Sequence, residues 1–171
     1  MMTKIREILQ LILAFLLVAL IFQLVFLSVN VKGKSMEPTY IEGERSIMVR
    51  KSKINKVDRY NVVVIKREIK ETNTSRIVKR VFGMPNETIE IKDKKIYING
   101  KEIEDKVDTS NIKIDDMAPL LLGDDEYFVL GDNRENSSDS RDPRIGVIKD
   151  REIEAVHGFI YWPINKVGTM K

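Results

Sequence analysis

The 171-residue sequence predicts a mainly β domain, built from antiparallel sheet, carried on one N-terminal transmembrane helix. An unbroken apolar run extends from Ile8 to Val29, and short β-rich segments recur behind it. Short apolar segments separated by polar turns are typical of strands. We therefore expect residues 1–7 to form a short cytoplasmic N-terminus and 8–29 to form the transmembrane anchor. Residues 30–171 are expected to form the β-rich domain, with a small lobe around residues 88–126.

The apolar run is long enough to cross a bilayer. Its 22 residues would form a helix of about 33 Å, which matches the hydrocarbon core. A cleavable signal peptide has a shorter apolar region and a small-residue cleavage site, and Leu27 to Val31 offers no such site. Its polar interruptions are Gln10, Gln23 and Ser28, too few for the polar face of a core helix. Positive charge flanks both ends, so the positive-inside rule does not fix the orientation of the run.

The domain behind the run is expected to consist mostly of strands. Five segments are rich in β-branched or aromatic residues: Arg45 to Arg50, Tyr60 to Lys66, Arg76 to Phe82, Tyr127 to Leu130 and Phe159 to Trp162. Thr88 to Ile98 alternates apolar and polar residues around Asp93-Lys94, which predicts a hairpin. Gly100 to Glu126 is polar and acid-rich without a firm period, which leaves a small lobe and a long ordered loop both open.

The charge pattern excludes several classes of function. Of 29 Lys and Arg, two precede the run and 27 follow it, while 25 of 26 Asp and Glu follow it. The two signs are interleaved, and no basic run is mixed with aromatic residues, so a nucleic-acid partner is not expected. The chain has no cysteine, which excludes disulfides, thiolate metal sites and a cysteine nucleophile.

A serine nucleophile in this chain would need an unusual base. The one histidine, His157, precedes Gly158 with no carboxylate motif beside it, and we interpret it as a structural or surface residue. A neutral lysine can replace histidine as the base. Lys79 shares one face of its predicted strand with Ile77 and Val81, where burial would favour the neutral amine. The pattern alone, however, favours an exposed lysine-arginine pair on an edge strand.

A third unusual segment, Gly131 to Arg141, has almost no apolar side chain. A calcium loop is excluded, because Arg134 stands where an oxygen ligand is needed and Ser137 replaces the turn glycine. We interpret Asp139 and Arg141 as a charge-assisted pair that stiffens the loop.

Three sequence boxes follow the anchor in order. They read Ser-Met-Glu-Pro-Thr at Ser35 to Thr39, Lys-Arg-Val-Phe-Gly-Met-Pro at Lys79 to Pro85, and Gly-Asp-Asn-Arg-Glu-Asn-Ser-Ser-Asp-Ser-Arg at Gly131 to Arg141. Their order and spacing, with Trp162-Pro163 behind them, resemble bacterial type I signal peptidases over essentially the whole chain. The short middle region resembles the compact enzymes of Gram-positive bacteria.

The resemblance implies a Ser-Lys dyad. Ser35 would be the acylating nucleophile and Lys79 its general base, in place of the exposed lysine that the strand pattern favoured. Ser137 matches the family serine that orients the lysine. The oxyanion would be held by the backbone N–H of Ser35. Some relatives add a hydroxyl two positions earlier, but this chain has Gly33 there, so a side-chain donor is absent.

The resemblance also implies supporting residues. Asp139 and Arg141 match the structural ion pair of the family, and Asp132 matches a further supporting carboxylate. The family usually has glycine after the proline of the second box, where this chain has Asn86. Asparagine tolerates positive φ better than most residues, so the turn is expected to survive.

The implied function is a membrane-bound serine endopeptidase, a hydrolase that cleaves signal peptides from exported preproteins through an acyl-enzyme. Family members bind the residues before the cleavage point as an added strand. Neither an organic cofactor nor a metal is expected. The implied partners are preproteins and membrane lipid, met at the secretion translocon, with no nucleic acid. The implied location is the bacterial cell membrane, with a single pass and the catalytic domain outside the cytoplasm.

Two other interpretations fit part of the sequence. A Ser-Lys autoprotease of the repressor-processing type has a related fold, but it predicts a cytosolic chain with a DNA-binding part, against which the run Ile8 to Val29 argues. A non-enzymatic, membrane-anchored binding domain predicts a function independent of Ser35 and Lys79. Ser35 is the sixth residue after Val29, and six extended residues reach at most ~20 Å, so Ser35 is expected near the membrane surface.

Overall fold

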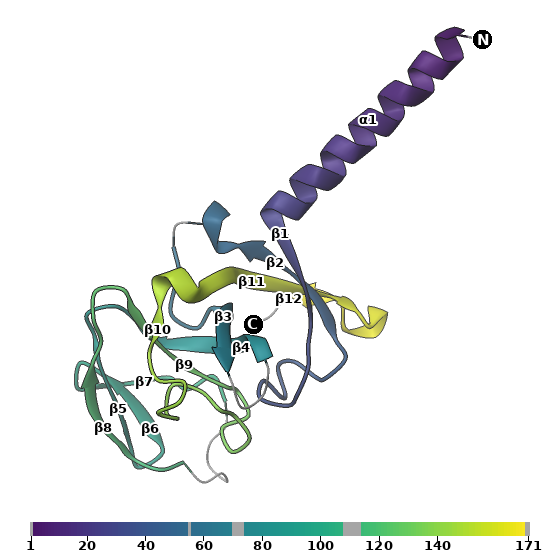
Figure 1. Cartoon of the computed structure of the whole chain (residues 1–171). Coiled ribbons are helices and arrows are strands. Elements are labelled where there is room, and N and C mark those ends of the chain that lie inside the picture. Colours follow the sequence, from purple (N-terminus) through teal and green to yellow (C-terminus); the bar gives the residue numbers. More distant parts are fainter. Residues whose placement is uncertain (1, 55, 70–73, 108–113, 170–171) are drawn as a thin grey trace.

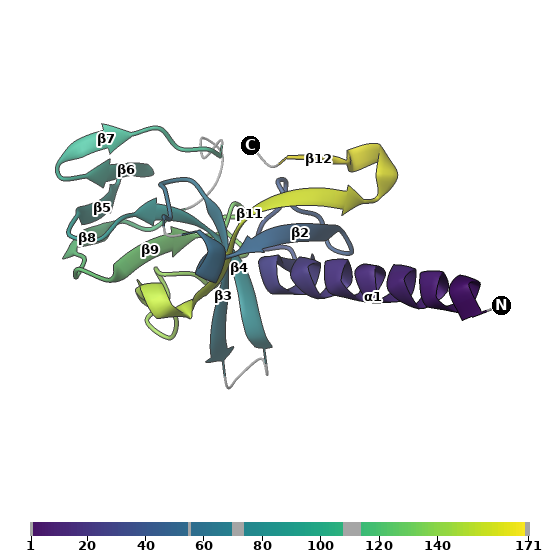
Figure 2. The same ribbon diagram turned by 90° about the horizontal axis from the view of Figure 1, so that it is seen from above.

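The protein is a single long helix joined to a domain of two antiparallel sheets (Figure 1). The computed structural model describes residues 2–54, 56–69, 74–107 and 114–169. The helix projects away from the domain in Figure 1, and its C-terminal end meets β1 (Phe26–Asn30) and β2 (Arg45–Arg50) (Figure 2). This architecture confirms the predicted fold class, a mainly antiparallel β domain with one N-terminal apolar helix.

The larger sheet has eight strands in the order β1-β2-β11-β3-β4-β9-β10, with β12 also paired to β11. Its strands are β1 (Phe26–Asn30), β2 (Arg45–Arg50), β3 (Val62–Ile69), β4 (Thr74–Gly83), β9 (Glu126–Leu130), β10 (Ile148–Lys149), β11 (Ile153–Trp162) and β12 (Gly168–Thr169). Three short 3₁₀ turns lie between strands: η1 (Lys51–Lys53), η2 (Asp150–Glu152) and η3 (Ile164–Lys166). Because each pairing is antiparallel, short turns and loops suffice to connect neighbouring strands.

The smaller sheet has four strands in the order β7-β6-β5-β8. They are β5 (Thr88–Lys92), β6 (Lys95–Ile98), β7 (Lys101–Ile103) and β8 (Met117–Leu121). The predicted hairpin is β5-β6, and its turn residues Asp93 and Lys94 both have positive φ, 50° and 64°. Residues 100–126, for which a lobe and a loop were both open, contribute β7 and β8 to this sheet; residues 108–113 lie outside the described part.

The helix α1 spans Met2–Val25, so the expectation of a helix continuing to Val29 is wrong. The chain leaves the helix at Phe26 because the next five residues pair with β2, from Phe26 opposite Val49 to Asn30 opposite Arg45. Leu27 is thereby buried in the core of the domain. The strand β1 adds about 17 Å of extended chain before the loop that carries Ser35.

Within the described residues, α1 is the one helix long and apolar enough to cross a membrane. The segment Lys4–Val25 has a mean hydropathy of 2.8, and no part of it is buried against the domain. A helix that is apolar on all sides and unburied by protein is typical of a membrane span.

Strand β3 explains how the larger sheet holds the site. Val62 and Val64 enter one apolar cluster, and Val63 and Ile65 enter a second one on the opposite face. The continuous apolar run is therefore buried on both faces rather than alternating. The first cluster also contains Met36 from the loop between β1 and β2, so the core of the sheet anchors that loop.

Candidate active site

Ser35 lies in the loop of residues 31–44 between β1 and β2. The loop makes a tight turn there, in which the Tyr40 amide donates to the Met36 carbonyl at 2.8 Å. Met36 and Tyr40 are both almost fully buried and fasten the turn to the core. From the other side, the Asn133 amide donates to the Ser35 carbonyl at 3.0 Å. Packing and a hydrogen bond therefore hold the Ser35 backbone from two directions.

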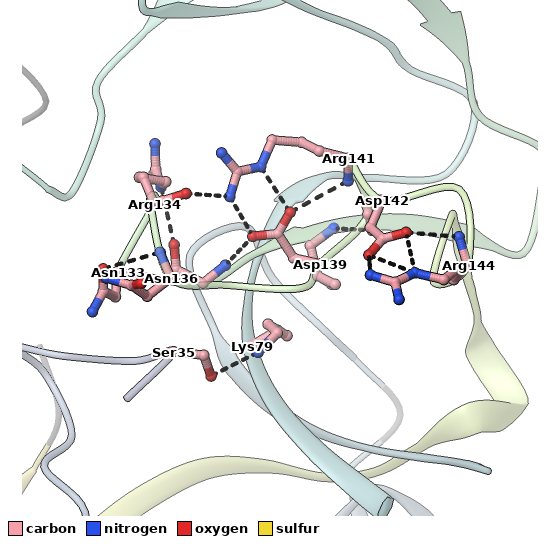
Figure 3. Close-up of polar contacts among 12 residues, drawn as sticks. Ser35, Lys79, Asn133, Arg134, Asn136, Asp139, Arg141, Asp142 and Arg144 are labelled. Atoms are coloured by element: carbon pink, nitrogen blue, oxygen red, sulfur yellow. Dashed lines mark hydrogen bonds and ion pairs between the residues drawn. The ribbon is translucent and has the colours of Figure 1, made fainter. Parts of the chain in front are cut away.

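Lys79 reaches Ser35 from the middle of β4. Its Nζ donates a hydrogen bond to Ser35 Oγ at 2.8 Å (Figure 3). The residue pairs with Val63 in the sheet and is only 3 % exposed. The strand pattern favoured an exposed lysine-arginine pair, which is wrong for both residues, because Arg80 is buried as well. A period-two pattern cannot show that neighbouring segments cover both faces of the strand.

Burial lowers the pKa of Lys79 to about 8, because the buried site favours the neutral amine over the ammonium. Asp139 and Asp132 oppose this change, and Arg141 adds to it. At pH 7 roughly one lysine in ten is then neutral, against fewer than one in a thousand at an ordinary pKa near 10.4. A neutral amine 2.8 Å from a serine hydroxyl can accept its proton and turn the hydroxyl into a nucleophile.

The loop after β9 contains the predicted ion pair. Arg141 donates from Nε and Nη2 to the two carboxylate oxygens of Asp139, both at 2.8 Å (Figure 3). Asp139 is fully buried and also accepts the Gly131 amide at 2.9 Å. A bidentate pair with a third hydrogen bond is rigid. The expected charge-assisted contact is therefore present, and it ties the two ends of the loop together.

Asp132 joins the three sequence boxes through a second ion pair. Its carboxylate accepts Arg80 Nε at 2.9 Å and Nη2 at 2.7 Å, with both side chains buried. The Thr39 hydroxyl donates to the same carboxylate. Thr39 belongs to the first box, Arg80 to the second and Asp132 to the third. The sequence analysis did not identify Thr39 and Arg80 as partners of Asp132, although both residues lie inside the sequence boxes.

Ser137 lies against the backbone of the site but does not bond to the lysine. Its hydroxyl is buried and has no hydrogen-bond partner among the described residues, so the expected contact with Lys79 is not made in this structure. A Cβ added at Gly131 would stand 2.1 Å from Ser137 Oγ and 2.5 Å from the Ser35 carbonyl oxygen. Gly131 is therefore required here because three segments meet with no room for a side chain. The orienting role of Ser137 stays a prediction.

The two departures from the family pattern have clear structural settings. Asn86 adopts a positive φ of 64°, which confirms that asparagine carries the turn after Pro85. Gly33 also has positive φ, and its amide donates to Glu42 Oε1 at 3.2 Å. His157 is exposed at a bulge of β11, with φ of 53°, which agrees with its interpretation as a surface residue.

A groove of about 740 Å³ runs past the Ser35–Lys79 pair. One wall is formed by residues 28–36, from β1 and the following loop, and the other by residues 76–79 of β4. Both walls offer free strand edges, because β1 ends the larger sheet and β9 pairs with β4 only from Arg80 onward. Within the described part of the chain, no group of three or more His, Asp or Glu side chains is placed to hold a metal ion.

Comparison with known proteins places this chain in a family. The model of the family described as signal peptidase, peptidase S26, matches residues 4–162 of this chain. A signal peptidase I of Bacillus amyloliquefaciens is 34% identical over 170 residues, covering 94% of this chain and 89% of the relative. Signal peptidase I T of Bacillus subtilis is 35% identical over 171 residues, covering 94% and 86%. A crystal structure of a signal peptidase I from Enterococcus faecalis is 29% identical and covers 59% of this chain and 96% of its own, with a TM-score of 0.47. The chain belongs to the S26 family of signal peptidases.

Proposed function

We propose that this protein is a membrane-anchored serine peptidase that removes signal peptides from exported preproteins, with Ser35 as nucleophile and Lys79 as general base. The observation that carries the proposal is the 2.8 Å contact between Ser35 Oγ and the buried Lys79 amine. The names of the relatives, signal peptidase I, support the substrate class. A serine with a base of lowered pKa is one of the general ways to activate a hydroxyl nucleophile.

In the proposed reaction, Ser35 Oγ attacks the scissile carbonyl carbon while neutral Lys79 takes the hydroxyl proton. The new oxyanion faces the backbone N–H of Ser35, which stabilises the developing charge. The tetrahedral intermediate collapses by breaking the C–N bond, and the Lys79 ammonium returns its proton to the leaving amine. Water then attacks the acyl-enzyme, with Lys79 again as base, and releases the signal peptide.

The groove supports binding of the substrate as an added strand. The backbone edges of β1 and β4 face it from two sides, so an extended peptide could hydrogen-bond to either edge. Its walls include Val31, Val64 and Val78, of which Val31 and Val64 are buried. Such a surface suits small apolar side chains before the cleavage point.

The membrane context is also part of the proposal. We place α1 across the bacterial cell membrane as a single span, with the domain outside the cytoplasm, where preproteins emerge from the translocon. Four large apolar side chains at the end of β11 and in the segment after it are exposed, and they support contact with membrane lipid: Phe159, Trp162, Ile164 and Val167. Apolar and aromatic side chains of this kind are favoured at the membrane interface.

One experiment tests this function directly. The full chain in detergent is mixed with a preprotein, beside Ser35→Ala and Lys79→Ala. Ser52→Ala and Lys95→Ala, at exposed positions remote from the groove, serve as matched controls. We expect signal-peptide release by wild type and by both controls, and none by the two site variants. If wild type releases nothing, or if either site variant cuts at the wild-type rate, the proposal is wrong.

A further inference from the structure

Arg134 is a buried cation that the proposed reaction does not use. It lies in the loop between β9 and β10, and its side chain is only 1 % exposed. Its Nη1 and Nη2 donate to the two carboxylate oxygens of Asp105, each at 2.5 Å. Its guanidinium carbon also lies 4.9 Å from the centre of the Phe82 ring, within the range of a cation–π contact. A guanidinium buried this completely needs such partners, because an uncompensated charge is expensive away from water.

Asp105 lies just beyond the edge strand of the smaller sheet. It follows β7, whereas Arg134 belongs to the loop that contains Ser137, Asp139 and Arg141. Where the two parts face each other they border a cavity of about 540 Å³, lined by residues 115–117 on one side and by loop residues on the other. Elsewhere an apolar cluster with Phe82 and Phe128 from the larger sheet and Ile89 and Ile96 from the smaller one packs across this boundary. The Asp105–Arg134 ion pair bridges it with a bidentate geometry that fixes both distance and angle.

The ion pair reaches the backbone of the site through two hydrogen bonds. Arg134 Nε donates to the Gly131 carbonyl at 3.1 Å, and the Arg134 carbonyl accepts Arg141 Nη2 at 2.8 Å. Gly131 is the residue that packs without clearance against Ser137 and the Ser35 carbonyl. A shift of the Arg134 side chain would therefore move the Gly131 peptide, and with it the surface that supports Ser35.

We propose that Asp105 is a positioning residue for the reaction, because its ion pair with Arg134 fixes the loop that packs against Ser35. This inference rests on the proposed function and adds a role for the segment that follows β7 of the smaller sheet, which supplies the carboxylate. Asp105 acts through Arg134 and does not touch the reacting atoms. The smaller sheet is thereby part of the active site's support rather than an independent lobe.

The test compares Asp105→Asn and Arg134→Lys with a neighbouring control, Glu104→Gln. Glu104 pairs with Lys106 and its side chain is 74% exposed, so its substitution changes the same charge at the surface. We expect Asp105→Asn to lower kcat about 10- to 100-fold with KM changed less than about twofold, because the groove residues are untouched. Arg134→Lys removes the bidentate hydrogen bonding to Asp105 and should lower kcat to a similar extent, again with little change in KM. The double variant should lose little more than either single one, since both substitutions remove the same contact.

Two further measurements separate positioning from general stability. A loosened loop admits water to Lys79, so the midpoint of the pH–rate profile should move above that of wild type. The charged groups that face Lys79, namely Asp132, Asp139 and Arg141, are unchanged by the substitution. If the variant merely contained less folded protein, its cleavage rate would fall by the same factor at every pH, and the midpoint of the pH–rate profile would not move. Amide hydrogen exchange in residues 131–141 should become faster in Asp105→Asn and stay unchanged in Glu104→Gln.

The outcomes distinguish the two proposals. If wild type does not release signal peptides, the proposed function fails, while hydrogen exchange still tests the Asp105–Arg134 contact by itself. If wild type is active and Asp105→Asn keeps its kcat, its pH midpoint and its exchange rates, the positioning role is refuted. If Asp105→Asn and Arg134→Lys both simply unfold at the assay temperature, the pair serves global stability and the positioning role is again refuted.

Discussion

Replacing Lys79 with methionine should make the folded domain more stable near neutral pH while abolishing cleavage. Burial lowers the pKa of Lys79 to about 8 in the folded protein, against an ordinary value of 10.5. This difference corresponds to roughly 3 kcal/mol, since a tenfold change in proton affinity is worth about 1.4 kcal/mol. A methionine of similar length carries no charge and avoids that penalty.

The sign of the effect depends on pH. Below pH 8 the lysine is charged in both the folded and the unfolded chain, so the folded state bears the whole cost of burying an ammonium. Between pH 8 and 10.5 the unfolded chain binds more protons than the folded one, and the stability of wild type therefore rises with pH. Above 10.5 the amine is neutral in both states and the cost disappears.

The lost hydrogen bond to Ser35 Oγ works in the opposite direction. A typical intramolecular hydrogen bond contributes about 1 kcal/mol. We therefore expect Lys79→Met to be more stable than wild type by about 2 kcal/mol at pH 7 and less stable by about 1 kcal/mol above pH 10.5. The crossover between these limits is the distinctive result.

Urea unfolding of the full chain in non-ionic detergent, followed by the circular dichroism of the sheets, measures this difference at pH 7 and pH 10.5. Comparing wild type with the variant at each pH cancels the titration of all other groups. Lys95→Met, at an exposed position on the smaller sheet, is the control and should show no gain at pH 7. A difference that is the same at both pH values, or a Lys79→Met variant that is less stable at pH 7, would refute the reasoning.

The remaining predictions concern rate and packing. The cleavage rate should rise about tenfold per pH unit below pH 8 and level off above it, since only neutral Lys79 accepts a proton; a flat profile between about pH 6 and 9 would contradict its role as base. Gly131→Ala should reduce activity at least ~100-fold, because its Cβ would stand 2.1 Å from Ser137 Oγ, whereas Gly168→Ala, with open space around it, should cut normally. Asp132→Asn should lower the free energy of unfolding by about 3–5 kcal/mol in urea titrations, because it leaves a buried guanidinium without its counter-charge; a loss below about 1 kcal/mol would show that the pair is dispensable.

Local pattern predicted much of the strand structure. The range Arg45 to Arg50 matches β2, and the alternation around Asp93-Lys94 predicted the β5-β6 hairpin with its turn. These two predictions were confirmed because side-chain periodicity and turn chemistry are properties of residues that are neighbours in the sequence. The prediction that the apolar helix continues to Val29 was wrong for the same reason. Phe26 to Val29 is as apolar as the helix before it, and only its pairing with β2 makes it a strand.

The sequence by itself determined the long apolar N-terminal helix, the β class and the three boxes, and through the boxes the resemblance to signal peptidases. Only the tertiary structure decided that Lys79 is buried, that it stands 2.8 Å from Ser35 Oγ, and that Asp105 reaches Arg134 across the two sheets. These contacts join residues 29 and 44 positions apart in the chain. Burial and charge pairing between residues so far apart in the sequence depend on which faces of the sheets pack together. A periodic pattern of neighbouring residues carries no information about that packing.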